Sequence, residues 1–242
     1  IGLQGIGVHR FVAEKLPDLY SQGATVIVNI CGSTIDEYVE ITRILADADG
    51  VDAIELNISC PNIKAGGITF GNSAVGTSEV VQAVRSVTKL PIIPKLTPNV
   101  TDIAGIARAA EEAGADAVSL VNTFLAMAID VETRRPALSN GVGGLSGPAI
   151  RPIAVRMVYE CSQAVTIPII GMGGITTARD VLEFIIAGAT AVQVGTANFV
   201  NPNLWPKLLA DLEEYLSRHK IDRVQNLVGT LELTETQAWN SS

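Results

Sequence analysis

Short apolar runs alternate along the chain with longer segments in which apolar residues recur every three or four positions. The short runs predict buried strands, and the longer segments predict amphipathic helices. Strands are expected at residues 24–32, 53–58, 90–96, 117–123, 167–171 and 191–196. Helices are expected at residues 35–46, 78–87, 103–113, 151–163, 178–187 and 204–219, with a further short helix at 221–227.

The regular alternation of strand and helix predicts a parallel sheet with right-handed crossovers, either an open doubly wound sheet or a closed (β/α)8 barrel. Nearly every expected strand ends in a polar or Gly-containing motif, and only a barrel brings all such ends to one face. We therefore predict an α/β fold, a TIM (β/α)8 barrel, formed by residues 1–242 as one domain. Six strands do not close such a barrel, so we expect its first two strands upstream of Ile1. The tail at 232–242 is expected to be disordered.

Composition narrows the possible partners. Aromatic residues make up 5% of the chain and the formal net charge is −8, which argues against a stacking surface or a basic patch for nucleic acid. The cysteines at positions 31, 60 and 161 are widely spaced and contain no CxxC pair, so neither a metal site nor a disulfide framework is indicated. No apolar run reaches the length of a membrane span. We expect a protein of the reducing cytoplasm.

Cys60 stands in the segment Leu56-Asn57-Ile58-Ser59-Cys60-Pro61-Asn62, where a predicted strand ends. One interpretation is a small core residue, since free cysteine is among the most buried residue types. The other is a reactive thiol at a binding site. Asn57 and Asn62 favour the second, because carboxamides are poor core residues but good hydrogen-bonding partners for a planar polar ligand. The Gly-rich segment 63–71 that follows is expected to be a loop covering that ligand.

Glycines at the ends of the last two strands indicate a phosphate site. Gly173 and Gly174 follow one strand, Gly195 and Thr196 end the next, and a predicted helix follows each pair. Backbone N–H groups at such turns can bind an anion. The alternative is that the glycines only form tight turns. We favour phosphate, and FMN over a sugar phosphate, because polar strand ends with a buried Lys95 suit an isoalloxazine ring. The long polar segment 124–147 is also expected to be functional.

Five segments taken together resemble the class 1 dihydroorotate dehydrogenases. The resemblance is closest to the class 1B catalytic subunit, through Ile63-Lys64-Ala65-Gly66-Gly67, and runs from Ile1 to about Leu227. It implies a TIM barrel that binds FMN and oxidises (S)-dihydroorotate to orotate in de novo pyrimidine biosynthesis. The segments are Leu56–Asn62, Pro94-Lys95-Leu96-Thr97-Pro98-Asn99, Val121-Asn122-Thr123, Gly144-Leu145-Ser146-Gly147-Pro148-Ala149 and Ile169–Gly174.

The resemblance also implies a role for each matching residue. Cys60 is the base, and N5 of FMN accepts the hydride. The expected contacts to the flavin ring and ribityl chain are Asn29, Asn57, Lys95 and Val121. Those to ribityl and phosphate are Gly147, Gly173, Gly174, Gly195 and Thr196. The substrate is expected to contact Gly2, Leu3, Asn57, Asn62, Asn122 and Thr123.

A class 1B protein passes its electrons through a partner subunit, carrying FAD and a [2Fe–2S] cluster, to NAD. The resemblance therefore implies such a partner and a homodimer within a heterotetramer. The family's Ser, Lys and Asn contacts upstream of Ile1 are absent from this chain, so we expect it to lack part of the FMN site. Three alternatives stay open: a fumarate-using class 1A enzyme, a dihydropyrimidine dehydrogenase-like FMN barrel, and a non-catalytic phosphate-binding barrel.

Overall fold

The structure, a computed structural model, describes residues 5–59 and 70–234. The chain forms two compact units, and each is described by itself. The first unit runs to Asn122 and includes Ala164–Pro168; the second comprises Thr123–Gln163 and the chain from Ile169 onward.

Four parallel strands form the sheet of the first unit. They pair in the order β1-β2-β3-β4, and every pair is parallel. All four residues of β2 are buried, as expected for parallel strands covered on both faces. The strands are β1 (Ile27–Ile30), β2 (Ala53–Leu56), β3 (Ile92–Leu96) and β4 (Val118–Leu120), which confirms the first four strands expected from the sequence.

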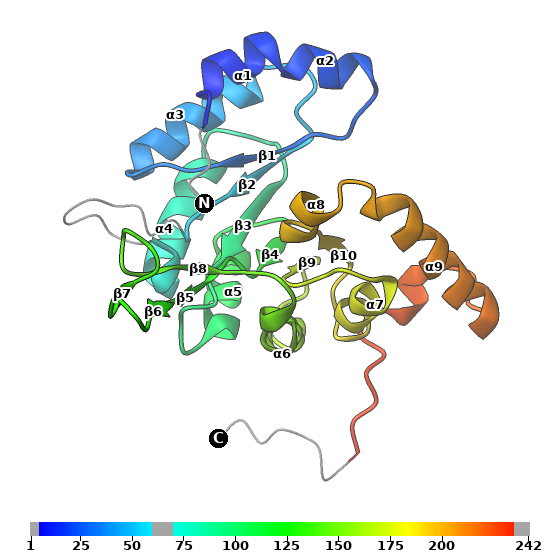
Figure 1. Cartoon of the computed structure of the whole chain (residues 1–242). Coiled ribbons are helices and arrows are strands. Elements are labelled where there is room, and N and C mark those ends of the chain that lie inside the picture. Colours follow the sequence, from blue (N-terminus) through cyan, green and yellow to red (C-terminus); the bar gives the residue numbers. More distant parts are fainter. Residues whose placement is uncertain (1–4, 60–69, 235–242) are drawn as a thin grey trace. The chain divides into compact units, whose positions relative to one another are not determined.

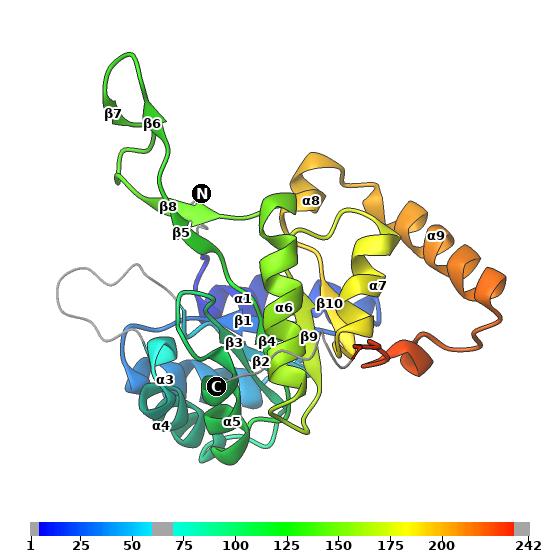
Figure 2. The same ribbon diagram turned by 90° about the horizontal axis from the view of Figure 1, so that it is seen from below.

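Three helices lie beside this sheet in Figures 1 and 2, and each begins at a side-chain cap. Thr34, Ser73 and Asp102 each accept a hydrogen bond from the backbone N–H three residues further on. The helix expected from residue 78 begins four residues earlier, because Ser73 caps it. These helices are α3 (Ile35–Ala46), α4 (Ala74–Arg85) and α5 (Ile103–Glu112).

The hydrophobic pattern missed the first two helices. They are α1 (Val8–Glu14) and α2 (Leu16–Ser21). No residue of α1 is buried, and Leu16 is the one buried residue of α2. Without an apolar face, neither segment shows the helical period on which the sequence-based assignment depends. A 3₁₀ turn, η1 (Phe70–Asn72), was also not expected and precedes α4.

The second unit contains the other two parallel strands, β9 (Ile169–Met172) and β10 (Ala191–Gln193), which pair with each other. The strand expected at 191–196 ends earlier, at Gln193, and Thr196 begins a separate helix. The short helix expected at 221–227 is a 3₁₀ turn of four residues, η3 (Val224–Leu227). The helices are α6 (Arg151–Ser162), preceded by the 3₁₀ turn η2 (Pro148–Ile150), α7 (Ala178–Ile186), α8 (Thr196–Val200) and α9 (Leu204–His219).

The long polar segment before α6 is folded into two antiparallel pairs. β5 (Phe124–Ala126) pairs with β8 (Gly143–Leu145), and β6 (Ile129–Asp130) pairs with β7 (Arg135–Pro136). Figure 2 shows β6 and β7 at the tip of this antiparallel arm. The sequence indicated an unusual connection here but not its strands, because two- and three-residue strands carry too few positions for a recognisable alternation.

In the described part of the chain, no helix has the length and apolar character needed to cross a lipid bilayer. The tail expected at 232–242 lies outside the described residues from position 235. Its disorder stays a prediction, as does the assignment of residues 1–242 to a single domain.

Candidate functional site

The candidate residues fall into three sets. Gly2, Leu3, Cys60 and Asn62 lie outside the described residues, as does most of the loop expected at 63–71. The first unit contains Asn29, Asn57, Lys95, Val121 and Asn122. The second unit contains Thr123, Gly147, Gly173, Gly174, Gly195 and Thr196.

In the first unit, strand register puts several polar side chains on one face of the sheet. Asn29 on β1 pairs with Glu55 on β2, Glu55 pairs with Ile93 on β3, and Lys95 pairs with Ser119 on β4. Register partners in neighbouring strands point to the same side, and so do residues two apart in one strand. Asn29, Glu55, Lys95 and Ser119 therefore share one face of this sheet.

Glu55 was not among the residues singled out from the sequence. Its side chain is buried, yet both carboxylate oxygens accept hydrogen bonds. Ser119 Oγ donates to Oε1 at 2.7 Å, and Asn29 Nδ2 donates to Oε2 at 2.5 Å. The sequence does mark this position, because Glu55 is a single acidic residue within the apolar strand Ala53–Leu56. In a strand with alternating faces, however, the same residue could equally point to solvent, so the sequence did not identify it as buried.

Two carboxamides expected to bind substrate lie together at the ends of β2 and β4. Asn122 Nδ2 donates to Asn57 Oδ1 at 3.2 Å. The backbone of Asn57 is held from two sides, since its N–H donates to Ile30 and its carbonyl accepts from the hydroxyl of Tyr38 at 2.8 Å. These bonds fix the Asn57 backbone and hold the two carboxamides next to each other, and carboxamides suit a planar polar ligand.

The residue before Cys60 is also held in place. The hydroxyl of Ser59 donates to the backbone carbonyl of Lys95 at 2.8 Å, which ties the end of β2 to β3. Ser59 is buried and Lys95 is half-buried. The half-buried ammonium of Lys95 lies on the same sheet face as Asn29, so this face offers both a cationic donor and a carboxamide to a ligand.

In the second unit, the glycine turns expected to bind phosphate lie close together. Gly174 has φ +75°, and a Cβ added to it would lie 2.6 Å from the carbonyl oxygen of Gly147. Thr196 Oγ1 donates to Ser146 Oγ at 2.8 Å, which joins the turn at Gly195 to the turn at Gly147. A Cβ added to Gly195 would meet no heavy atom within 4 Å, so the space beside that turn is open.

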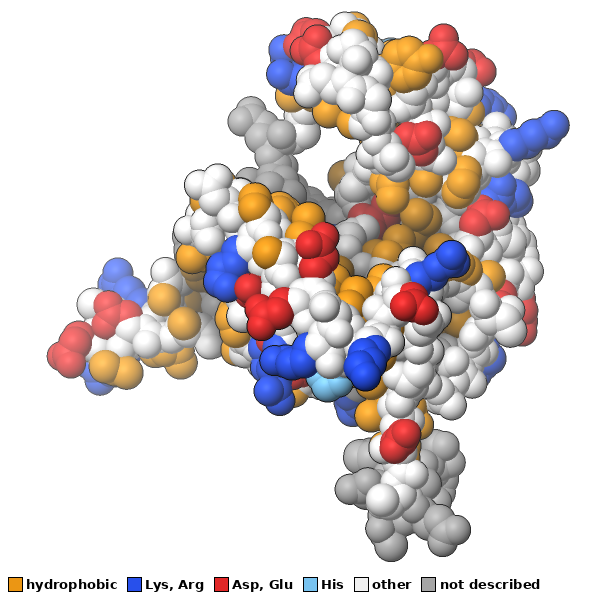
Figure 3. Space-filling model, turned by 90° about the vertical axis from the view of Figure 1, so that its right-hand side faces the viewer, with side chains coloured by type: hydrophobic (Ala, Val, Ile, Leu, Met, Phe, Trp, Pro, Cys, Tyr) orange, Lys and Arg blue, Asp and Glu red, His pale blue; other side chains and the backbone are white. Residues whose placement is uncertain are grey.

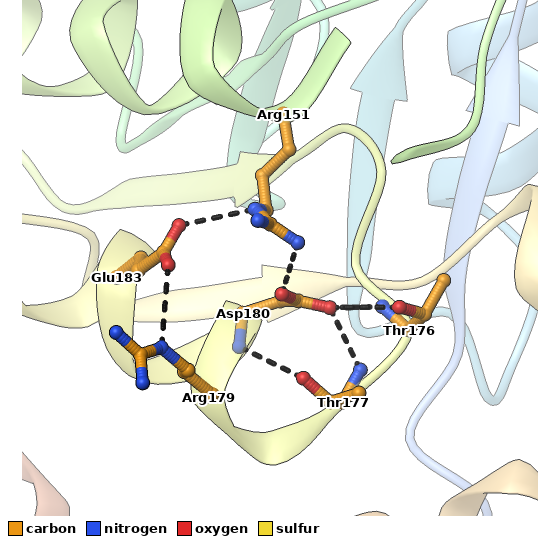
Figure 4. A network of polar contacts seen from close by, with 6 residues as sticks. All are labelled: Arg151, Thr176, Thr177, Arg179, Asp180 and Glu183. Atoms are coloured by element: carbon orange, nitrogen blue, oxygen red, sulfur yellow. Dashed lines mark hydrogen bonds and ion pairs between the residues drawn. The ribbon is translucent and has the colours of Figure 1, made fainter. Parts of the chain in front are cut away.

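An ion-pair network connects the beginnings of α6 and α7 (Figure 4). Asp180 accepts hydrogen bonds of 2.8–2.9 Å from the N–H and hydroxyl of Thr176 and from the N–H of Thr177. Arg151 Nη1 pairs with the other oxygen of Asp180. Arg151 Nε lies 3.0 Å from Glu183 Oε2, as an ion pair rather than an aligned hydrogen bond. Because Arg151 follows the Gly147 turn closely and Thr176 follows Gly174, the network holds these two turns together.

The same contacts determine the ionisation of Asp180. Its burial raises the pKa, but the hydrogen bonds from Thr176 and Thr177 outweigh that effect, so the pKa lies below its ordinary value of 3.8. Asp180 is also residue N3 of a capping box, in which Thr177 Oγ1 accepts from the Asp180 N–H. One carboxylate therefore stabilises the α7 start and binds Arg151.

Thr123, the remaining expected substrate contact, begins the second unit. Its hydroxyl lies against Gly144 of β8, where a side chain on residue 144 would collide with it. The glycine thus leaves room for the Thr123 side chain.

Figure 3 faces the side on which α9 lies in Figure 1, and basic side chains there stand beside acidic ones. On α9 itself, Lys207 forms an ion pair of 2.6 Å with Asp211. Arg218 lies over the ring of Tyr215. The charges on this helix are thus mixed in sign.

Comparison with known proteins supports the resemblance found in the sequence. A family model described as dihydroorotate dehydrogenase matches residues 1–216. The catalytic subunit of dihydroorotate dehydrogenase B (NAD(+)) from Desulforudis audaxviator is 56% identical over 234 residues, covering 97% of this chain and 76% of the relative. Its counterpart from Citrifermentans bemidjiense is 52% identical over 233 residues, covering 96% and 76%. That of Geobacillus kaustophilus is 53% identical over 229 residues, covering 95% and 73%.

Proposed function

We propose that this chain, which belongs to the dihydroorotate dehydrogenase family and is therefore an oxidoreductase, oxidises (S)-dihydroorotate to orotate. The fold of this family is the TIM barrel expected from the sequence. This reaction belongs to de novo pyrimidine biosynthesis. The observation that carries the proposal is identity of 52–56% to proteins named for this activity, across about 96% of the chain. The paired carboxamides Asn57 and Asn122 support it, because a pyrimidine presents amide edges that such groups can bind.

The cofactor in this proposal is FMN, which supplies the acceptor for the hydride when bound. Asn29, Asn57, Lys95 and Val121 would contact its ring and ribityl chain. Its ribityl and phosphate would be held by Gly147, Gly173, Gly174, Gly195 and Thr196. Two observations support the fit: the three glycine turns are held together, and the space beside Gly195 is open.

The proton is removed by Cys60, which acts as general base on the carbon next to a substrate carbonyl. A thiol serves in this role only as the thiolate. Asn57, Asn62, Asn122 and Thr123, with the backbone at Gly2 and Leu3, hold the substrate's pyrimidine edges and carboxylate. Lys95 would stabilise the negative charge that the transferred hydride brings to its acceptor.

The electrons leave through a partner subunit that carries FAD and a [2Fe–2S] cluster, which passes them to NAD in the cytoplasm. The relatives' names describe a catalytic subunit and NAD(+), and both suit this route. The assembly in this proposal is a homodimer within a heterotetramer. A class 1A enzyme, by contrast, would reduce fumarate without a partner.

The proposal is tested by mixing the FMN-loaded protein with dihydroorotate without oxygen and following flavin absorption. We expect the wild-type protein to bleach, and Cys60→Ala to retain FMN while bleaching about 10³-fold more slowly, the scale of losing a general base. Cys31→Ala is the matched control, because it removes an exposed thiol at the end of β1.

Absence of bleaching in the wild-type protein would refute the dehydrogenase activity. Bleaching of Cys60→Ala at the wild-type rate would leave the activity standing and remove Cys60 from the proton transfer.

A further inference from the structure

Glu55 is the one acidic side chain among the fully buried positions of β2, with an exposed fraction of 4%. Its carboxylate joins three strands of the first unit. Asn29 on β1 donates to one oxygen, and Ser119 on β4 donates to the other. Ser119 is completely buried, whereas Asn29 is exposed at the end of its strand. The carboxylate thus connects the sheet interior to a residue that a ligand can reach.

Stability alone does not explain this carboxylate. Burying a charged group is costly even when it is hydrogen-bonded, and apolar replacements of buried polar groups are often neutral or stabilising. The neighbours of Glu55 in its strand, Ile54 and Leu56, are apolar and completely buried. Those neighbours point to the opposite face of the sheet, whereas Glu55 shares its face with Asn29, Lys95 and Ser119, so its role concerns the polar groups of that face.

The effect of Glu55 on Asn29 is specific. A carboxylate only accepts hydrogen bonds, so the amide nitrogen of Asn29 must face it and the amide oxygen must point elsewhere. Without Glu55 the carboxamide could turn over and present its donor instead. Because Asn29 shares its sheet face with Lys95, a ligand on that face meets one fixed acceptor and one cationic donor.

We propose that Glu55 is a positioning residue, which holds the Asn29 carboxamide with its oxygen toward the cofactor so that Asn29 acts as a hydrogen-bond acceptor. The inference rests on the proposed function, in which Asn29 contacts FMN. Glu55 acts on the cofactor through Asn29.

A double-mutant cycle tests this, with FMN affinity measured by fluorescence titration and thermal unfolding measured on the FMN-free protein. Glu55→Leu should fold with an unchanged or higher unfolding temperature and bind FMN about tenfold more weakly, the scale of one misdirected hydrogen bond. Asn29→Ala should weaken binding similarly. In the Asn29→Ala background, Glu55→Leu should cause no further loss.

Two further variants separate positioning from charge. Glu55→Gln should bind FMN nearly as the wild type does, because its amide oxygen still accepts from Asn29 while its amide nitrogen faces the Ser119 hydroxyl. Ser119→Ala is the matched control, since it removes the Ser119 hydrogen bond to Glu55 and leaves the Asn29 contact intact. It should leave FMN affinity unchanged.

Four results would overturn the inference alone: wild-type FMN affinity in Glu55→Leu, equal losses in the presence and absence of Asn29, a Glu55→Gln variant as weak as Glu55→Leu, or a Glu55→Leu variant that fails to fold. The last result would assign Glu55 to the fold itself. A wild-type protein that binds no FMN would refute the cofactor in the proposed function, and this inference with it.

Discussion

The two units offer a ligand different kinds of contact. On the sheet of the first unit, side chains provide the chemistry: the carboxamides of Asn29, Asn57 and Asn122 and the ammonium of Lys95. In the second unit, the candidate contacts are mainly glycines, and what they offer is backbone. Each region also has its own acidic residue with hydrogen-bonded partners, Glu55 in the first and Asp180 in the second.

This difference determines which changes each region tolerates. A side-chain site keeps its function when a replacement preserves the hydrogen-bonding group, so Glu55→Gln is expected to be mild. A backbone site depends on the path of the chain, and any side chain that displaces a turn destroys it. The dependence of a backbone site on the path of the chain can be tested in the second unit, where Gly174 and Gly195 lie in neighbouring turns but have different surroundings.

Gly174→Ala should have the largest effect. Its positive φ disfavours an L residue by about 1–2 kcal/mol, and the added Cβ would also collide with the carbonyl of Gly147, so we expect a loss of about 3 kcal/mol in unfolding free energy. FMN affinity should fall about a hundredfold, because the Gly147 and Gly174 turns separate. Urea unfolding and fluorescence titration measure the two quantities.

Gly195→Ala is the matched control, because its Cβ meets nothing in the protein. It should unfold like the wild type while binding FMN more weakly, since the methyl group occupies the open space beside the turn. Equal stability of the Gly174 and Gly195 variants would contradict the close contact between the turns.

Arg151→Met should have the next largest effect. It leaves the buried carboxylate of Asp180 without its cation, which we expect to cost about 2 kcal/mol of unfolding free energy. FMN affinity should fall as well, because the starts of α6 and α7 lose their connection. Arg179→Met removes a contact of 3.9 Å from an almost fully exposed arginine to Glu183 and should cost less than about 0.5 kcal/mol. Equal losses of unfolding free energy in the Arg151 and Arg179 variants would show that the Arg151 network does not hold the Gly147 and Gly174 turns together.

The smallest expected effect is on the pH dependence of stability. Because the folded-state pKa of Asp180 is lowered, its contribution is present above the ordinary value of 3.8 and is lost as the pH falls toward the folded-state pKa. Asp180→Asn should therefore lose less stability below about pH 4 than the wild type does.

Urea unfolding from pH 6 down to pH 3 measures this difference. Glu111→Gln in the first unit is the comparison, because hydrogen bonds from the side chain and backbone of Thr166 also lower the pKa of Glu111. Its acid slope should change in the same direction, because its folded-state pKa is also lowered. An unchanged acid slope in Asp180→Asn would show that this carboxylate titrates alike in the folded and unfolded chain.

Elements that bury an apolar face were predictable, and those without one were not. The bounds of α3 and α9 match the sequence-based assignment exactly as residues 35–46 and 204–219. The helices α1 and α2 were missed because they bury almost nothing, and the β5–β8 and β6–β7 pairs were missed because their strands are too short. The start of α4 was placed four residues too late, because the cap is Ser73.

For this protein, the sequence by itself determined the order of the six parallel strands and the helices between them, the α/β class and the family, because periodic burial and short sequence motifs are local properties of the chain. The tertiary structure alone decided that Glu55 faces Asn29 and Ser119, and that Arg151 reaches Asp180. These contacts join residues 26 to 64 positions apart. Such distances in sequence leave no periodic signal, since strand register and helix placement bring these side chains together only after the apolar faces have packed.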